Sequence, residues 1–432
     1  MWRFFTIFIC LYGFMKELKV GEPFLYLYQN EVLNLTREQL TNEVYPFSAY
    51  SYLLSLIPIF LLTDLLLYKP VMLLEVIGQT IYRGVLVFCP TVEAQKLGMM
   101  MYGMASASEI AFFSYIYAKT EKDEYQRVTS YSRASTMAGR MICYLSAQTV
   151  ILTRIGNYET LQWIGFGVPC CAVIFAIFLP NVYWKEILLK LTDSTNRTSI
   201  VERIELPKTY GAYLKYRLHV MRNELVRIYQ IDAIRKWSIW WALNTCMSLQ
   251  VAQYAQVLWG EVQGRNERSL NGFAEAAYAA SATIAILILG LAEINWDKWG
   301  ELMLAVISLT DTLILIVYSQ AESIQVMYMC YIGYRWNLAK KMIGESFGLI
   351  FGLNSFIALT LQVLLTIIVP DHHGLNMPVR KQFMVYAGCH AFIGTIFLTS
   401  LGYSLYRHYR WKERIHTEQC QKHTLHEQKV IA

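Results

Sequence analysis

Stretches of about 20 mostly apolar residues, the length that a helix needs to cross the hydrocarbon layer of a bilayer, recur along nearly the whole chain. The 432 residues are 55% hydrophobic and 16% charged, and a soluble domain would leave much of this apolar surface without a core to enter. We therefore predict an all-α membrane protein with about twelve transmembrane helices. The expected spans are residues 4–28, 45–67, 71–88, 97–118, 128–153, 161–183, 237–259, 272–291, 302–318, 324–340, 348–369 and 382–406.

The distribution of charge divides the chain into two halves. A net charge of +6 would suggest a nucleic-acid surface in a soluble protein, but here the Lys and Arg residues gather between the spans, so no nucleic-acid partner is expected. Six spans, a long inner loop and six more spans is the layout of the major facilitator fold, in which two six-helix bundles rock around a site at the midplane. The predicted parts are an N-terminal bundle (1–183), a cytosolic loop (184–236), a C-terminal bundle (237–406) and a cytosolic tail (407–432).

The same charge rule predicts that both termini are cytosolic and that the first loop faces outward, in a multi-pass protein of the plasma membrane. Asn34 begins a glycosylation sequon in this outer loop, whereas the sequon at Asn196 falls in the cytosolic loop and is expected to be unused.

Nothing in the sequence points to catalysis, to a metal or to a cofactor. We find no HExxH motif, nucleophile elbow or glycine-rich phosphate loop. His372 and His373 are adjacent, but no second pair follows at metal-ligand spacing. Most of the nine cysteines lie in apolar segments and are interpreted as small buried hydrophobes. An enzyme is therefore not expected, and a receptor or structural membrane protein remains the rival to a transporter.

Ionisable residues inside the spans are the first candidates for function, because each costs about 2.5 to 3.5 kcal/mol to insert at a helix centre. In the fourth span Tyr102, Ser106, Glu109 and Phe113 follow at helical spacing and share one stripe. One interpretation is a site for a flat cation that pairs with the carboxylate and stacks on the rings. The other is a polar stripe that ties this helix to its neighbours.

An ordered series of motifs resembles the reduced folate carrier and thiamine transporter family. The series includes Gly21-Glu22-Pro23-Phe24, Leu62-Thr63-Asp64, Tyr125-Gln126-Arg127-Val128, Trp240-Trp241-Ala242-Leu243 and Phe351-Gly352-Leu353-Asn354. It covers nearly the whole chain apart from the central loop and the tail. The resemblance implies a vitamin transporter that works by alternating access, with a small-molecule vitamin and the lipid bilayer as its partners.

The resemblance also bears on which vitamin is carried. The family's folate carriers present basic residues in the fourth and eleventh spans, where this chain has Glu109 and Gln362, as the thiamine members do. A carboxylate there disfavours an anionic folate and favours a thiamine-like cation. Met99, Ser48 and Arg83 depart from the thiamine pattern, so folate transport, or a member with altered or lost vitamin transport, stays open.

The resemblance extends the candidate site to both halves. Glu22, which lies between Gly21 and Pro23, is expected to turn into the cavity, or else to be an interfacial glutamate. Asp64, with Lys69 behind it, is expected to control gating, and the alternative is a helix-end aspartate that reaches water. The second half contributes Trp240, Tyr254, Asn271 and Glu275 to the predicted binding wall, although Trp240 could equally belong to an interfacial belt. The oligomeric state is left open.

Overall fold

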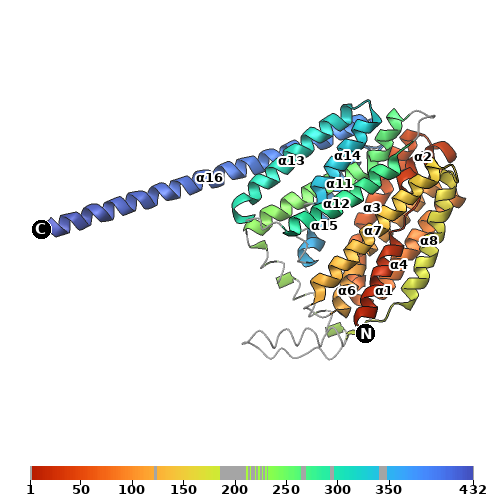
Figure 1. Ribbon diagram of the computed structural model, residues 1–432, viewed down its shortest axis with the longest axis horizontal. Helices are drawn as coiled ribbons and strands as arrows, with labels where there is room; N and C mark the ends of the chain where they lie inside the picture. The colour runs from red at the N-terminus through yellow and green to blue at the C-terminus, as the bar shows by residue number, and fades with distance from the viewer. Residues whose placement is uncertain are drawn as a thin grey trace.

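The computed structural model describes residues 2–120, 124–184, 232–263, 269–291, 296–339 and 348–431, together with isolated positions between 211 and 230. Every regular element in this part of the chain is helical (Figure 1). The longer helices are α1 (Trp2–Lys16), α3 (Pro46–Leu65), α4 (Lys69–Phe88), α5 (Val92–Ser108), α6 (Ile110–Lys119), α7 (Tyr125–Leu152), α8 (Tyr158–Phe178), α11 (Asp232–Val262), α12 (Asn271–Leu291), α13 (Trp296–Gln320), α14 (Ile324–Ala339), α15 (Gly348–Ile368) and α16 (Val379–Ile431).

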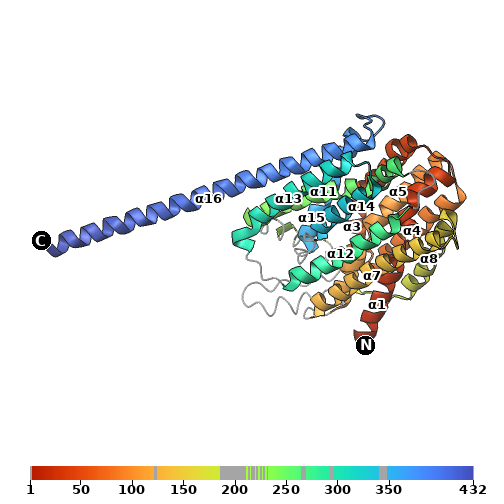
Figure 2. The same cartoon turned by 45° about the horizontal axis from the view of Figure 1, so that its top comes forward.

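These helices form two bundles that lie side by side (Figures 1 and 2). Helices α1 to α8 make one bundle and α11 to α16 make the other, with α3 packed on α15 and α7 packed on α12 where the bundles meet. Helices α5 and α6 are separated by one residue and together correspond to a single predicted span. The thirteen longer helices therefore correspond to the twelve predicted spans. The prediction of an all-α chain in two six-helix bundles is confirmed.

Length and hydropathy single out four segments of the described chain as able to cross a membrane. They are Lys69–Phe88, Tyr158–Phe178, Gly300–Gln320 and Val379–Ser404. Helix α7 carries the internal charges Arg133 and Arg140, and the fourth predicted span is divided into α5 and α6. Those charges and that division coincide with the candidate site.

The first predicted span, residues 4–28, is discontinuous next to Gly21-Glu22-Pro23, the sequence at which a bend of the backbone was expected, although the end of α1 at Lys16 was not. Helix α1 ends at Lys16, and short helical turns resume at Glu22–Phe24, Leu25–Leu27 and Tyr28–Val32. Pro23 stands in the first turn of the resumed segment, where its missing N–H costs nothing. Broken helices of this kind place polar groups at the midplane in transporter folds.

Hydrogen bonds join the two bundles at the end opposite the N-terminus, which we call the distal end. Gln253 of α11 donates to the Tyr45 carbonyl at 2.6 Å, and Gln256 donates to the Glu22 carbonyl at 2.9 Å. The Gly272 amide of α12 donates to Gln148 Oε1 of α7 at 2.9 Å.

An ion pair adds to this distal contact. The Arg37 guanidinium lies 2.9 Å from one oxygen of Glu261, whose other oxygen lies 2.9 Å from Arg380. One carboxylate of the C-terminal bundle thus links cations from both bundles.

The last helix runs without interruption from the bundle into the tail. Helix α16 comprises 53 residues and projects far beyond the other helices, ending at the C-terminus (Figure 1). The expected span 382–406 and the expected tail 407–432 are therefore parts of one helix.

Candidate functional site

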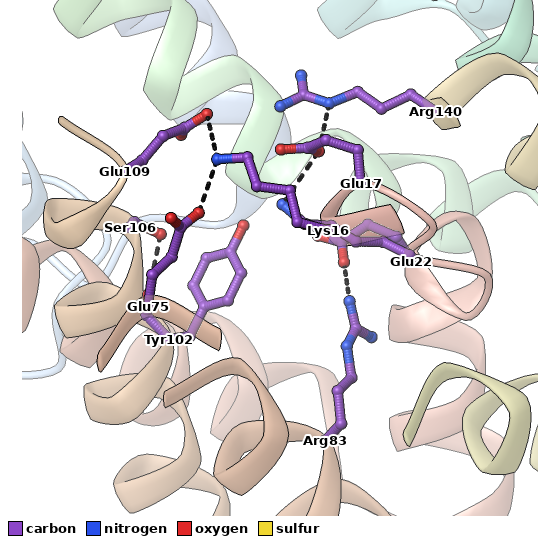
Figure 3. Close-up of polar contacts among 10 residues, drawn as sticks. Lys16, Glu17, Glu22, Glu75, Arg83, Tyr102, Ser106, Glu109 and Arg140 are labelled. Carbon is purple, nitrogen blue, oxygen red and sulfur yellow. Dashed lines mark hydrogen bonds and ion pairs between the residues drawn. The ribbon is translucent and has the colours of Figure 1, made fainter. Parts of the chain in front are cut away.

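The end of α1 carries a buried lysine that contacts two carboxylates. Lys16 Nζ lies 2.8 Å from Glu75 Oε1 on α4 and 3.5 Å from Glu109 Oε1, at the junction of α5 and α6 (Figure 3). The Lys16 side chain is only 2% exposed. Its ammonium also lies 4.7 Å from the ring centre of Phe112, close enough for a cation–π contact.

Three further ion pairs surround this lysine. Glu17 Oε2 accepts from Arg140 Nε of α7 at 2.7 Å and lies 3.4 Å from Lys19 Nζ. Glu22 pairs with Arg83 of α4 (Figure 3). We call these residues the charged cluster, and its four cations balance its four carboxylates: Lys16, Lys19, Arg83 and Arg140 with Glu17, Glu22, Glu75 and Glu109.

Exposure distinguishes the members of the charged cluster. The side chains of Glu17 and Glu75 are 2% and 8% exposed, whereas Glu22 is 24% and Glu109 is 43% exposed. A cavity of about 20 Å³ lies behind the cluster, between α1, α4 and α8, and has room for little more than a water molecule. This cavity is too small for a solute of vitamin size. Glu109 does not line it and presents the most exposed carboxylate of the cluster, on the side that we call the open side.

The fourth span is interrupted for one residue, at Glu109. Helix α5 ends at Ser108 and α6 begins at Ile110, with the Glu109 amide bonded to the Ser106 carbonyl at 3.3 Å. Glu109 itself keeps helical backbone angles, with φ −58° and ψ −26°. Ser106 Oγ donates to the Tyr102 carbonyl of its own helix at 2.9 Å, so this hydroxyl is satisfied within α5.

The aromatic members of the stripe lie on either side of this interruption. The Tyr102 ring lies 5.0 Å from that of Tyr82. Phe113 packs edge-on against Phe112, and the Arg133 guanidinium lies 5.4 Å from its ring centre. Tyr102 and Phe113 thus flank Glu109 along the chain, as the sequence predicted, but each already contacts a neighbour.

A second polar group lies in the C-terminal bundle. Tyr328 donates to Asn271 Oδ1 at 2.7 Å, and Tyr331 contacts both oxygens of Glu275 at 3.0 Å. The Arg335 guanidinium stacks 3.9 Å from the ring centre of Tyr278. The spacing of four correctly places Asn271 and Glu275 on one face of α12, and that face meets the tyrosines of α14.

The remaining predicted binding residues are buried away from the charged cluster's contacts. Trp240 Nε1 donates to Ser308 at 3.0 Å inside the C-terminal bundle, where the side chain packs in a core with α13 and α16. Tyr254 is fully buried, with its ring 6.3 Å from Tyr45 of the other bundle. Gln362 is 4% exposed, and its carbonyl accepts from Gln250 at 3.0 Å. None of these contacts joins Trp240, Tyr254 or Gln362 to Glu109 in the described residues.

The predicted gating and glycosylation residues lie at the ends of the bundles. Lys69 Nζ donates to the Ile177 carbonyl at 2.7 Å and so links α4 to α8. Asp64 belongs to the last turn of α3, and its side chain lies outside the described residues. Asn34 is exposed in the turn that follows Val32, whereas Asn196 lies outside the described residues.

The sequence interpretation did not include Lys16, Glu17 and Lys19 among the intramembrane charges. The rule that flagged Glu109, an ionisable residue within an apolar span, applies equally to these three. They lie within the predicted span 4–28, so their positions alone were sufficient to flag them.

A wide groove on the N-terminal bundle faces away from the charged cluster. It measures about 710 Å³ and runs between α1 and α7, with Ile7 and Tyr131 in its lining. Ile7 precedes Lys16 by nine residues and Tyr131 precedes Arg140 by nine, which at about 100° per residue places each pair on opposite sides of its helix. The groove is therefore on the outside of the bundle and does not belong to the site.

Comparison with known proteins identifies the family. The reduced folate carrier family model matches residues 1–385. Folate-like transporter 3 of Caenorhabditis elegans is 38% identical over 421 residues, which cover 95% of this chain and 98% of the relative. Human thiamine transporter 1 is 32% identical over 449 residues, which cover 92% and 89% of the two chains.

Solved structures agree on the architecture. The peptide transporter POT in complex with sulfate superposes with a TM-score of 0.60 at 12% identity, covering 91% of this chain and 93% of that one. The nucleoside transporter NupG gives 0.58 at 11% identity, covering 91% and 98%. At such identities the likeness concerns the fold, which is that of a multi-pass membrane transporter. Together with the match along residues 1–385, it establishes that the chain belongs to the reduced folate carrier family.

Proposed function

We propose that this chain carries a thiamine-like organic cation across a membrane, and that Glu109 is the counter-charge for that cation. The observation that supports this role is the 43% exposure of the Glu109 side chain beside a helix break, while the neighbouring Glu75 is buried. The Tyr102 ring, which is partly exposed and packs 5.0 Å from the buried Tyr82 ring, offers a flat cation an aromatic contact within the same bundle. The names of relatives such as human thiamine transporter 1 favour the same class of solute.

Transport in this proposal proceeds by alternating access. The distal end corresponds to the outside of the cell, both termini are cytosolic, and the contacts of Arg37, Gln253 and Gln256 with the opposite bundle hold the outer side closed. Asp64 and Lys69, at the opposite end, act on the equilibrium between the outward and inward states rather than on binding. The plasma membrane is the proposed location.

Folate is the second candidate, and a specific observation favours it. Lys16, Arg83 and Arg140 bring three basic groups to the charged cluster. The folate-like transporters of C. elegans are also more similar to this chain, at 38% identity, than the human thiamine transporters, at 31% and 32%. Each of these bases already has a carboxylate partner, however, so an anion would have to break an ion pair.

The test compares thiamine with a reduced folate, using purified full-length protein and labelled uptake into vesicles. Glu109→Gln keeps the shape of the side chain and removes its charge, so thiamine binding should weaken by about 2 to 4 kcal/mol if the ion pair is desolvated, and by less if water reaches it. Glu93→Gln is the matched control, because Glu93 lies on α5 at the end far from Glu109, and its carboxylate is 83% exposed. Parental thiamine affinity in Glu109→Gln, or uptake of folate without thiamine, would refute the cation proposal.

A further inference from the structure

We propose that Lys16 is a built-in cation that occupies the Glu109 subsite in the empty transporter and sets how tightly a cationic solute binds there. This inference rests on the proposed cation function. It goes further, because it assigns the competitor that the solute has to displace. Lys16 belongs to the protein itself, at the end of α1, and its ammonium has the same charge as the proposed solute.

The two contacts of the ammonium are unequal. The 2.8 Å contact with Glu75 is a normal charge-assisted hydrogen bond, whereas the 3.5 Å contact with Glu109 is longer and therefore weaker. Lys16 and Glu75 are buried, while the Glu109 side chain, which contacts the same ammonium, is 43% exposed (Figure 3). A cation that arrives from the open side meets Glu109 first and competes for the weaker of the two contacts.

Glu75 has the capacity to retain the displaced lysine. Its Oε1 accepts from Lys16, and its buried Oε2 has no hydrogen-bond partner among the described residues. The ammonium carries three donors, so it can move onto both oxygens of Glu75 when it releases Glu109. The lysine then stays paired in the buried position, and Glu109 is free to bind the solute.

The position of Lys16 connects this exchange to the backbone. Helix α1 ends at Lys16, and the segment that follows leads to Glu22, whose carbonyl accepts from Gln256 of the other bundle. A shift of the lysine toward α4 therefore acts on a break in the first span, close to the junction of the bundles.

The competing explanation is that Lys16 only neutralises the buried Glu75. A double variant separates the two roles. Lys16→Gln with Glu75→Gln removes both buried charges, keeps the side-chain sizes similar and leaves Glu109 without its competitor. Competition predicts tighter thiamine binding, because Glu109 no longer has a cationic partner that the solute must displace. The gain should be smaller than the roughly tenfold effect of removing one like charge at about 6 Å in a medium with an effective dielectric constant of about 40, because the lost Glu75 carboxylate also attracted the solute. A purely structural lysine predicts unchanged affinity.

Lys16→Arg provides a second variant that retains the charge and the buried pair. The guanidinium fork can hold Glu75 and Glu109 at the same time, so it should be harder to displace and thiamine binding should weaken by about tenfold. Lys236→Gln with Glu301→Gln is the matched control, because it removes a Lys–Glu pair of 2.6 Å at the end of the C-terminal bundle and should leave affinity unchanged.

The experiment measures thiamine affinity by calorimetry on purified full-length protein, with the melting temperature of each variant as a check of folding. Tighter binding in Lys16→Gln/Glu75→Gln and weaker binding in Lys16→Arg support the inference. Parental affinity in either folded variant overturns the role of Lys16 while leaving the cation function intact. Absence of thiamine binding in the parent and in every variant overturns the cation function itself.

Discussion

The close approach of α7 and α12 at the distal end makes Gly272 the sharpest test of alternating access. A methyl group at this position would lie 2.8 Å from Gln148 Cβ and 2.8 Å from the Tyr144 carbonyl oxygen, well inside van der Waals contact. Gly272→Ala should cost about 1 to 3 kcal/mol for overpacking. It also loosens the 2.9 Å bond from the Gly272 amide to Gln148, which contributes about 1 kcal/mol.

The closed distal interface should therefore lose about 2 to 4 kcal/mol, which lowers its population relative to the open state by about 30-fold to 700-fold. Hydrogen exchange of peptides from the end of α7 and the start of α12 should become faster, and uptake should slow, because the cycle has to pass through the closed state. Gly167→Ala is the control, since a methyl group at Gly167 meets nothing within 4 Å. Parental uptake and exchange in Gly272→Ala would refute the view that this interface has to close during transport.

The other predictions concern the distal ion pair, the gate and the topology. Glu261→Gln keeps the shape but removes the charge between Arg37 and Arg380, so exchange at the distal end should rise by the equivalent of about 1 kcal/mol, and unchanged exchange would mean that solvent screens these pairs. Asp64→Asn should reduce the transport rate more than thiamine affinity, and equal turnover with weaker binding would instead place Asp64 in the site. Deglycosylation of protein made in a secretory pathway should shift its mass, and the shift should vanish in Asn34→Gln; a shift that depends on Asn196 would reverse the topology.

The sequence predicted the positions of most spans well, because a long run of apolar residues is a property of the local sequence. The span expected at 45–67 is α3, Pro46–Leu65, and the span expected at 272–291 is α12, Asn271–Leu291. The sequence did not predict the residues at which a span is interrupted. The fourth span is interrupted at Glu109, between α5 and α6, and the end of α1 at Lys16 was not expected. A hydrophobicity window averages across such breaks and cannot locate them.

The pairing of charges could not be predicted, because it depends on which helices become neighbours. Glu17 and Arg140 are 123 residues apart in the chain and 2.7 Å apart in the structure. Arg83 was noted as a departure from the thiamine pattern, and its partner proves to be Glu22, a residue that the sequence had assigned to the cavity. By contrast, the shared face of Asn271 and Glu275 follows from helical spacing alone, and the structure confirms it.

The balance of the charged cluster has an electrical consequence. Four cations and four carboxylates sum to zero, so a rocking motion that carries the empty cluster through the membrane field moves no net charge with it. The charged cluster then adds nothing to the voltage dependence of the empty carrier's return. A monovalent cation adds one charge to the loaded step, which is worth about 2.3 kcal/mol per 100 mV. The membrane potential of a cell that is negative inside would thus drive accumulation of such a solute. Each transport step of the loaded carrier would also contribute to a measurable current.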